Sequence, residues 1–360
     1  MGLYVGLDIS QKQTTICVVD EQGKVVVQGG SLTRASDIDG WLGNRVDRAQ
    51  IVRVGLEAGN MSSWIYSGLI KLGLTVVVLE AFQAHRFLAT QRNKTDKNDA
   101  RGLAQLTRMG EEFLKLVTVR SQDNQETRAL LAMREHLAGQ KRDLENHIAG
   151  VLKPFGLVVA RGNVVPETFR ERVIDALCAA ADHGVEIRHF VVPPLDLYRN
   201  ACSQLEVLNK QVEQMAADNP VCRRFMTVPG IGPVTALSFF SAVDFPQRFK
   251  HGADVGAYFG LTPRQFQSGE TDHMMGISKR GDAMVRRHLV TAATVLLTAT
   301  RKWCPLKAWG MKIAKRQGLA KARVAVARKL AVLLHSLWIK GEDFQWKAVP
   351  ATDREGLVPA

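Results

Sequence analysis

The order of β-rich and helical segments in the first 110 residues constrains the fold more than any other feature of this sequence. Three short β-rich segments, separated by glycine and polar turns, follow one another and predict an antiparallel meander. Two further strands then alternate with helices, the first of which is expected to be capped by Ser36. This alternation predicts an α/β domain with a mixed sheet and helices on its faces. The predicted strands are residues 3–10, 14–20, 24–32, 50–58 and 74–81, and the predicted helices are residues 36–46 and 62–73.

Two long segments in the middle of the chain are predicted to be helices. Residues 121–152 contain no proline, and their apolar residues recur at three- and four-residue steps among charges. Residues 195–220 form a second amphipathic segment, and residues 164–184 between the two predict a short helical insert. Because neither long helix can bury its apolar stripe alone, they predict an antiparallel hairpin or a coiled coil between subunits. The last third of the chain reads as mainly helical, with glycine-rich joints.

The charge of the chain indicates a polyanionic partner. The 360 residues carry a formal net charge of +13, and 46% of them are hydrophobic, which predicts a globular protein. Such an excess of positive charge favours nucleic acid before membrane. The five cysteines lie far apart without a Cys/His cluster, which is typical of reduced thiols in the cytosol. Neither a signal peptide nor a membrane-spanning run of about 18 apolar residues is recognised, so we expect a cytoplasmic protein.

Four carboxylates from three distant segments are predicted to meet at one edge of the sheet. Asp8 in "VGLDIS" and Glu57 in "VGLEAG" each follow an apolar run, a glycine and one more apolar residue at the end of a strand. Strand ends of a mixed sheet face a common crevice, so these two acids meet if the first and fourth strands are neighbours. Asp96 and Asp99 lie three positions apart on a helix predicted over residues 87–109, and so share one face of it.

Carboxylate oxygens are the ligands that hard divalent cations prefer, so the four acids predict a site for Mg²⁺ (or Mn²⁺). Two such ions can clamp the attacking and leaving oxygens of a phosphodiester. The plainer alternatives are a turn or cap residue after each strand, and a solvated helix face for the pair. At a real metal site, the neighbouring Lys94, Lys97 and Arg101 would contact the approaching phosphate backbone. Actin-like ATPases and sugar kinases also open on a strand ending in Asp, but no glycine-containing phosphate loop follows Asp8.

Two segments in the last third carry further candidate site residues. In "VPGIGPVTA", Gly230 follows a helix-breaking proline and Gly232 precedes another, which predicts a tight turn whose amides meet phosphate. The turn resembles a helix-hairpin-helix, although it can also be a plain connection between helices. Ser268 lies in "LTPRQFQSGE", a predicted loop or short extended segment, and a serine near cations and a metal can attack phosphorus. Spacing alone does not select it, because a Ser-Gly is usually a turn. The nearby cations are Arg264, Lys279, Arg280, Arg286 and Arg287.

At these residues the chain resembles the insertion-sequence one-ten family of transposases, DEDD-type recombinases of which many are guided by a bridge RNA. The resemblance covers nearly the whole chain. One departure is visible, because many members have two glycines after the serine, where this chain has Gly269 and Glu270. The resemblance rests on "GLDIS", "GLEAG", "KTDKNDARGLAQL", "VPGIGPVTA", "FGLTPRQFQSGE", "GISKRGD" and "KARVAVARKLAVLLH".

The resemblance implies a domain order, a site and partners. It implies a RuvC-like (RNase H-like) DEDD catalytic domain at 1–115, a coiled-coil region with a helical insert at 116–220, a transposase domain with a helix-hairpin-helix and the catalytic serine at 221–345, and a tail at 346–360. It implies that Asp8, Glu57, Asp96 and Asp99 bind Mg²⁺, and that Ser268 forms a transient phosphoserine link to DNA. The implied partners are DNA, a bridge RNA and further copies of the chain in a homodimer or homotetramer. The implied location is the bacterial or archaeal cytosol, in association with the nucleoid.

These features predict a transposase that cuts and rejoins DNA through a serine-linked intermediate and a junction resembling a Holliday junction. One alternative is a RuvC-like, metal-dependent junction nuclease that uses water, in which Ser268 is only a turn residue. Another is a non-catalytic DNA- or RNA-binding protein whose acids are surface charges. A covalent protein–DNA adduct separates the transposase from the nuclease.

Overall fold

The computed structural model describes residues 2–89, 93–110, 113–161, 165–268 and 271–346. They fold into two compact units, Met1–Arg120 and Ser121–Ala360. The tail predicted at 346–360 lies, apart from its first residue, outside the described residues. Within the described ranges no helix combines the length and the apolar character needed to cross a lipid bilayer.

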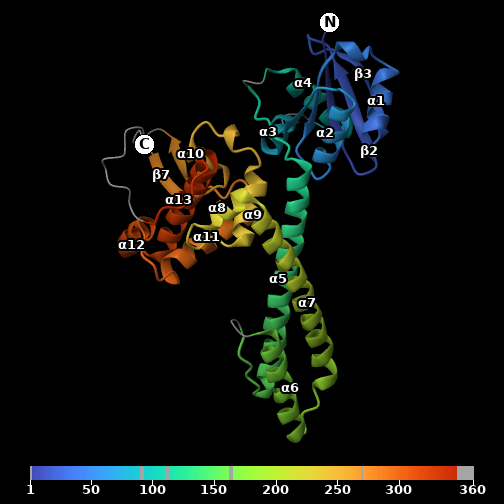
Figure 1. The fold of residues 1–360 in the computed structure, drawn as a ribbon. Coiled ribbons are helices and arrows are strands. Elements are labelled where there is room, and N and C mark those ends of the chain that lie inside the picture. Colours follow the sequence, from blue (N-terminus) through green and yellow to red (C-terminus); the bar gives the residue numbers. More distant parts are fainter. Residues whose placement is uncertain (1, 90–92, 111–112, 162–164, 269–270, 347–360) are drawn as a thin grey trace, which may run out of the picture. The chain divides into compact units, whose positions relative to one another are not determined.

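The first unit is built on a five-stranded sheet in the order β3-β2-β1-β4-β5 (Figure 1). β1 (Leu3–Ile9), β2 (Gln13–Val19) and β3 (Val25–Leu32) form the predicted antiparallel meander. β4 (Ile51–Glu57) pairs in parallel with β1, and β5 (Val76–Leu79) pairs in parallel with β4. The predicted mixed sheet is therefore confirmed, and the first and fourth strands are neighbours, which is the condition for Asp8 and Glu57 to meet.

Helices cover both faces of this sheet. The helices of the unit are α1 (Ala35–Gly43), α2 (Ser62–Lys71), α3 (Ala81–Leu88) and α4 (Asp96–Arg108), with a short 3₁₀ turn at Arg48–Gln50. α1 and α2 pack on one face, where alternate strand residues such as Val5 and Leu56 are fully buried. α4 packs on the other face against Cys17 and Val19, and α3 packs beside α4. Residues that alternate along each strand thus face different helices, as the pleat of a sheet requires.

Two predicted helix starts in this unit are wrong. α1 begins at Ala35 with Arg34 at its cap position, so Ser36 is not the cap. The helix predicted over residues 87–109 begins only at Asp96, because the hydroxyl of Thr95 accepts a hydrogen bond from the Asn98 amide (3.2 Å) and caps it. Because α4 begins at Asp96, both Asp96 and Asp99 lie in its first turn.

The second unit begins with the long helices, which form an antiparallel hairpin within one chain (Figure 1). The helices of this lobe are α5 (Gln122–Leu152), α6 (Pro166–Asp182) and α7 (Arg188–Asp218), with a 3₁₀ turn at Lys153–Phe155. Leu131 of α5 and Val212 of α7 share one buried cluster, whereas Ile148 and Leu195 share another further along the pair. α7 begins earlier than predicted and contains Pro193 and Pro194. The burial of Leu195 beside them helps to hold this part of the helix in place.

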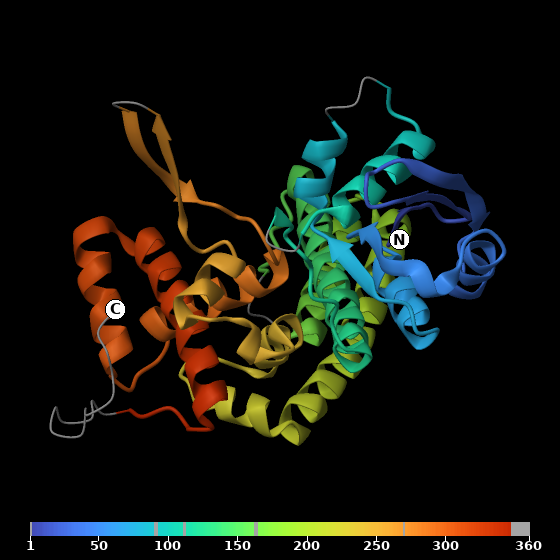
Figure 2. The same cartoon turned by 90° about the horizontal axis from the view of Figure 1, so that it is seen from above.

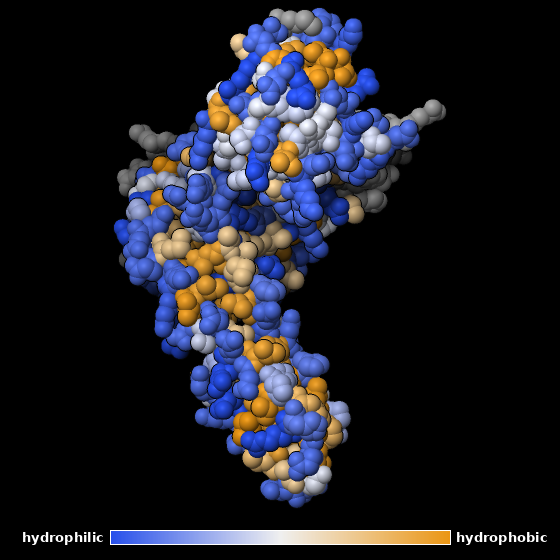
Figure 3. All heavy atoms as spheres, turned by 90° about the vertical axis from the view of Figure 1, so that its right-hand side faces the viewer, coloured by the Kyte–Doolittle hydropathy of each residue, from blue (hydrophilic) through white to orange (hydrophobic). Residues whose placement is uncertain are grey.

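Apolar side chains are also exposed on the lobe formed by α5, α6 and α7. Figure 3 shows them interspersed with hydrophilic residues over its surface. The large ones are Met133, Phe155, Val158, Val165, Phe190, Leu197, Val207 and Met215. A coiled coil between subunits would need such residues, and it stays a prediction.

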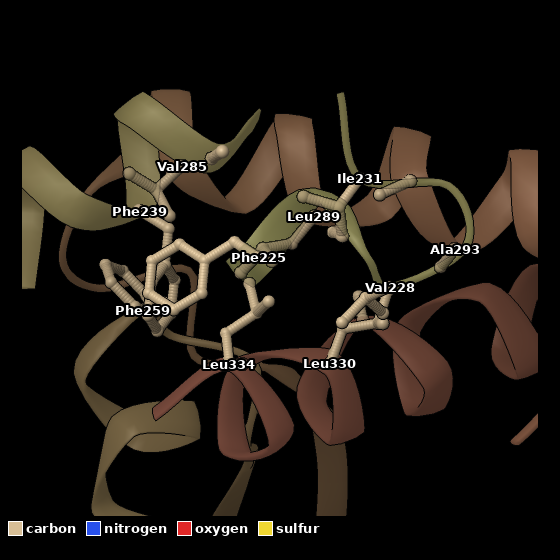
Figure 4. Close-up of a cluster of buried hydrophobic side chains, with 14 of the residues drawn as sticks. Phe225, Val228, Ile231, Phe239, Phe259, Val285, Leu289, Ala293, Leu330 and Leu334 are labelled. Atoms are coloured by element: carbon tan, nitrogen blue, oxygen red, sulfur yellow. The ribbon is translucent and has the colours of Figure 1, made fainter. Parts of the chain in front are cut away.

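The rest of the second unit is a helical body around one hydrophobic core. Its elements are α8 (Pro220–Met226), α9 (Pro233–Val243), α10 (Gly252–Tyr258), β6 (Pro263–Ser268), β7 (Thr271–Ile277), α11 (Ala283–Thr298), α12 (Pro305–Gln317) and α13 (Leu319–Lys340), with a 3₁₀ turn at Pro246–Arg248. Phe239 contacts Phe225 and Phe259, with ring centroids 5.4 and 5.5 Å apart. Leu330 and Leu334 of α13 belong to the same cluster (Figure 4). α13 therefore buries its apolar face against its own domain.

Candidate active site

Asp8 and Glu57 emerge side by side from neighbouring strands of the first unit. β1 and β4 are parallel, and Leu7 pairs with Leu56. Asp8 and Glu57, the next residue of each strand, therefore lie at the same edge of the sheet. Both carboxylates are half-buried. They line one open pocket of about 630 Å³, whose other walls come from residues 9–11 and 58–62. The predicted meeting of these two acids at strand ends is therefore what the sheet topology produces.

The glycines of the two strand motifs let α4 lie directly on the sheet. A Cβ on Gly6 would stand 2.2 Å from the Ala104 nitrogen and 2.3 Å from the Ala100 oxygen. A Cβ on Gly55 would stand 1.8 Å from the hydroxyl oxygen of Thr107. Real side chains cannot approach so closely, so only glycine permits this contact.

This contact also directs the first turn of α4 toward Asp8. Gly6 and Asp8 are two residues apart and so point to the same face of the sheet, the face that α4 covers. α4 touches Gly6 through Ala100, and one turn back from Ala100 lies Asp96. A strand step of two residues and one helical turn are similar lengths, about 6 Å. The side chains at the start of the helix therefore lie near the end of β1.

Asp96 is exposed and Asp99 is half-buried in this first turn. Acidic residues are favoured at this position by the positive end of the helix dipole. The side-chain amide of Gln28 on β3 donates to the Lys97 carbonyl oxygen (2.6 Å) and ties the turn to the sheet. The backbone of the turn is thus fixed from two sides, by this bond and by the Thr95 cap.

The four carboxylates act on one another electrostatically. The pKa of Asp8 is raised from 3.8 to about 6, first by burial and then by the negative charges of Asp96, Asp99 and Glu57. The pKa of Glu57 is also raised, chiefly by burial, with Asp99 adding to the shift. Lys94 opposes both shifts. A like charge raises a carboxyl pKa only when it is close, so three distant segments of sequence converge on one electrostatic site.

The donor set suits a hard divalent cation, because it consists of carboxylate oxygens alone. Among the described residues, however, no three His, Cys, Asp or Glu side chains form a closed ligand group. The carboxylates at this edge that are available to such an ion are those of Asp8, Glu57, Asp96 and Asp99.

Two further residues belong to this edge and were missed by sequence reasoning. Glu80 follows directly after β5, in which Leu79 pairs with Glu57. The negative charge of Glu80 helps to raise the pKa of Glu57. Its carboxylate caps α3 by accepting from the amides of Phe82 and Gln83 (3.1 and 2.9 Å). The run "VVVLEA" shows the same apolar stretch before an acid and could have revealed it. His85 on α3 lowers the pKa of Glu57, and no sequence motif marks it.

The cations predicted around the acids are all exposed. Lys94 lies close enough to oppose the shifts at Asp8 and Glu57, whereas the charge of Arg101 acts on Cys17 on the covered face. Burial raises the pKa of that thiol to about 11. Lys97 is exposed in the first turn of α4, and Arg101 lies one turn further along the same helix.

Ser268 ends one strand of the β6–β7 hairpin, which projects from the helices of the second unit (Figure 2). β6 and β7 pair antiparallel, with Ser268 opposite Thr271, so the extended segment was the correct one of the two predicted conformations. Gly269 and Glu270, the departure from the family pattern, lie outside the described residues. Arg264 at the start of β6, and Lys279 and Arg280 after β7, are exposed.

Arg286 and Arg287 have partners within the protein. The Arg286 guanidinium donates to the carbonyl oxygens of Phe259 (3.1 Å) and Arg280 (3.2 Å). Arg287 forms an ion pair with Glu135 of α5 (2.9 Å). Both arginines, which the sequence suggested for phosphate binding, thus help to hold α11 in place.

Gly230 and Gly232 shape the turn between α8 and α9. Gly230 has a φ of +89° and packs against α11, where a Cβ would stand 2.5 Å from the Ala292 oxygen. Gly232 is exposed at the cap position of α9, and no side chain caps this helix. Pro233 has no N–H to satisfy, so the amides that follow it are the donors available to an anion.

The sheet order, the acids at the ends of β1 and β4, and the acids in the first turn of α4 are consistent with a RuvC-like DEDD domain. Two family models match the chain, one described as "Transposase", of DEDD type, at residues 5–156, and one described as "Transposase IS116/IS110/IS902 family" at residues 222–306. The transposase for insertion sequence element IS1111A of Coxiella burnetii is 30% identical, over 95% of this chain and 91% of its own length. The chain belongs to the IS116/IS110/IS902 family of transposases.

Further relatives agree with this assignment. A probable family 20 transposase of Pseudomonas aeruginosa is 25% identical over 92% of this chain and 96% of its own length. The transposase for insertion sequence element IS1328 of Yersinia enterocolitica is 30% identical over 57% of this chain and 59% of its own length. The protein is therefore an enzyme that cuts and rejoins DNA, and its DEDD domain implies the use of a divalent metal.

Proposed function

We propose that this transposase exchanges DNA strands by two transesterifications, with Ser268 as the nucleophile and Asp8, Glu57, Asp96 and Asp99 as the Mg²⁺ (or Mn²⁺) ligands. The observation that supports the ligand set most strongly is the mutual electrostatic effect of these acids, seen in the raised pKa of Asp8. A bound divalent ion would neutralise the carboxylates and stabilise negative charge on the phosphate oxygens. Lys94 and Lys97 would contact the phosphate backbone beside it.

The chemistry balances without an energy source. The Ser268 hydroxyl loses its proton, its oxygen forms a bond to phosphorus, and the bond from phosphorus to a deoxyribose oxygen breaks. That deoxyribose oxygen takes up a proton and leaves as a hydroxyl. A hydroxyl of the partner strand then displaces the serine, which regains its proton. The number of phosphodiester bonds is conserved, so ATP is not required.

The second unit would provide DNA binding and the assembly of several copies of the chain, and a bridge RNA would provide the choice of DNA sites. We propose that the 221–345 region acts as the transposase domain, with the α8–α9 turn as a helix-hairpin-helix that contacts DNA through its free amides. A bridge RNA would choose the DNA sites by base pairing, in line with the resemblance to RNA-guided members. Exposed apolar residues on the α5–α7 lobe would pair copies of the chain into a homodimer or homotetramer. The expected site of action is the nucleoid of a prokaryotic cytosol.

The test is strand exchange on element-end DNA, with the co-purifying RNA and Mg²⁺, comparing four variants. Asp96→Asn and Ser268→Ala should each abolish exchange while nucleic-acid binding persists. Asp123→Asn is the matched control for the first, because Asp123 is an exposed acid in the first turn of a different helix, α5. Ser278→Ala is the control for the second, since Ser278 follows the same hairpin.

Each outcome decides a separate part of the proposal. Normal exchange by Asp96→Asn would make the acidic pair a solvated helix face. Loss of exchange in Ser268→Ala, with cleavage still intact, would favour the water-using nuclease alternative for the cutting step. Relatives that are transposases do not favour that alternative.

A further inference from the structure

A pocket in the second unit is lined by none of the residues assigned to the site so far. It is formed by α10, α12 and α13 and has a volume of about 640 Å³. Its walls are largely apolar, with Val332 and Ile339 of α13 and the indole of Trp309 of α12 among them. Trp309 and Ile339 are exposed, at 41% and 50%. An aromatic ring presented to solvent beside an apolar cavity is a surface on which a flat ligand can stack.

The rim of this pocket is cationic. Arg328, Lys329 and Lys340 of α13 line it, and no Asp or Glu does. Within the part of the chain that the structure describes, none of these three takes part in an ion pair. Arg328 lines the pocket, and its Cγ packs against α10, 2.9 Å from where a Cβ on Gly256 would stand. The free charges are therefore available to an anionic ligand.

The sequence around the pocket strengthens this charge. Residues 283–341 contain thirteen Lys or Arg and no Asp or Glu, against a net charge of +13 for the whole chain. The acids of the protein lie elsewhere, and the segment that builds α11, α12 and α13 has none to pair with its cations. Such a field attracts a polyanion rather than a single carboxylate.

The imidazole of His335, a buried polar group in the pocket wall, can form a hydrogen bond with a ligand. His335 is 7% exposed, and its Nε2 lies 2.9 Å from the Pro246 carbonyl oxygen. Because a carbonyl only accepts, Nε2 carries the proton, and in the neutral ring Nδ1 keeps a lone pair. Nδ1 lies toward Gly252, another wall residue, 3.7 Å from where a Cβ on Gly252 would stand. It can accept a hydrogen bond from the N–H group of a ligand.

We propose that this pocket binds an unstacked nucleobase of a single-stranded nucleic acid, with Trp309 as the stacking surface and Arg328, Lys329 and Lys340 on the flanking phosphates. The combination of a π-face, an apolar cavity and free cations is how proteins hold single strands. The proposal rests on the proposed function, in which guide RNA and exchanged DNA both expose such strands. RNA and DNA share this chemistry, and the experiment separates them.

The experiment measures binding of short labelled oligonucleotides of mixed sequence to the full-length protein, freed of nucleic acid and held without Mg²⁺. Single-stranded RNA, single-stranded DNA and duplex DNA are compared. Trp309→Ala should bind single strands about 5- to 160-fold more weakly, as the loss of one base–aromatic stack predicts, and should bind duplex DNA with unchanged affinity. Trp309→Phe should recover most of the affinity, because it keeps an aromatic face.

Two further variants make the result specific to the pocket. Trp303→Ala is the matched control, because Trp303 is also an exposed tryptophan beside a lysine (60% exposed, 5.1 Å from the Lys307 nitrogen) but does not line the pocket. It should bind like the wild type. Gly252→Leu should weaken single-strand binding by filling the cavity, since an added Cβ there meets only ordinary contacts. Lys329→Gln should lower the salt dependence of single-strand binding by about 0.7 in log–log slope.

The outcomes are distinct. A loss confined to RNA assigns the pocket to the guide, and one confined to DNA assigns it to the exchanged strand. Unchanged single-strand binding by Trp309→Ala, or an equal loss with Trp303→Ala, overturns the pocket proposal alone. Failure of the wild type to bind any oligonucleotide overturns the proposed function itself. Flotation with phosphatidylserine vesicles that depends on Trp309, without any effect on oligonucleotides, would make the pocket a membrane contact and overturn the proposal.

Discussion

Replacing Asp8 with asparagine is expected to stabilise the metal-free protein at neutral and alkaline pH. Burial and the charges of Asp96, Asp99 and Glu57 raise the pKa of Asp8 from 3.8 to about 6 in the folded state. The ionised carboxylate is therefore less favourable in the folded chain than in the unfolded one. Asparagine has nearly the same shape and carries no charge, so it removes this penalty.

The magnitude follows from the shift. A rise of about two pKa units corresponds to about 3 kcal/mol at 1.36 kcal/mol per unit. Because Asp8 is only half-buried, solvent screens part of this electrostatic penalty. We therefore expect Asp8→Asn to raise the free energy of unfolding by about 1–2 kcal/mol. The penalty is absent below the unfolded pKa, where the carboxyl is protonated in both states. It grows as pH rises through the folded pKa and is complete near pH 8.

The assay is urea unfolding in a chelator, at about pH 8 and about pH 4.5, of the wild type and Asp8→Asn. Asp37→Asn is the control, because Asp37 lies in the first turn of α1 with only a long ion pair to Arg34 (4.0 Å). It should lose a few tenths of a kcal/mol or nothing at both pH values. Mg²⁺ should then stabilise the wild type and have little effect on Asp8→Asn. Destabilisation by Asp8→Asn at pH 8, or the same gain at both pH values, would refute the electrostatic account.

Three other predictions concern packing and charge. Gly6→Ala and Gly55→Ala should abolish strand cleavage and lower the melting temperature, because the added Cβ atoms collide with α4. Gly40→Ala is the control, because a Cβ there meets nothing within 4 Å. It should leave stability unchanged or raise it by up to about 1 kcal/mol. Asp244→Ala should cost about 1–3 kcal/mol in urea unfolding, since the Asp244 carboxylate accepts from the amide and the hydroxyl of Ser121 (2.6 and 3.0 Å) at the start of α5. DNA affinity should fall steeply between low and moderate salt, and a flat titration would mean that the net charge of +13 serves another partner.

The sequence alone predicted the parts of the site that depend on strand order and alternation. Asp8 and Glu57 could be placed together because each follows a buried run and a glycine, and β1 and β4 proved to be neighbours. The same motifs did not reveal why the glycines are there, since the contact with Ala100 and Thr107 is made across the fold. Long-range packing of this kind has no local pattern.

Other parts could not be predicted because local chemistry or a distant partner decides them. α4 begins after Thr95, whose hydroxyl accepts a hydrogen bond from the Asn98 amide, and the sequence reasoning did not recognise this cap. Arg286 and Arg287 were predicted from charge to contact phosphate, which stays a prediction, and their partners within the protein, two carbonyl groups and Glu135, could not be predicted from the sequence. Ser268 was selected by the family resemblance, because a Ser-Gly by itself indicates only a turn.

The measurement that tests the central claim most directly is the mapping of a covalent link between protein and DNA. The protein is incubated with Mg²⁺, its co-purifying RNA and element-end DNA, then denatured, digested with protease and nuclease, and analysed by mass spectrometry. The account predicts a nucleotide attached through phosphate to the peptide that contains Ser268, present in the wild type and in Ser278→Ala and absent in Ser268→Ala. Cleaved DNA ends without any protein-linked nucleotide, or a link at another residue that persists in Ser268→Ala, would contradict it.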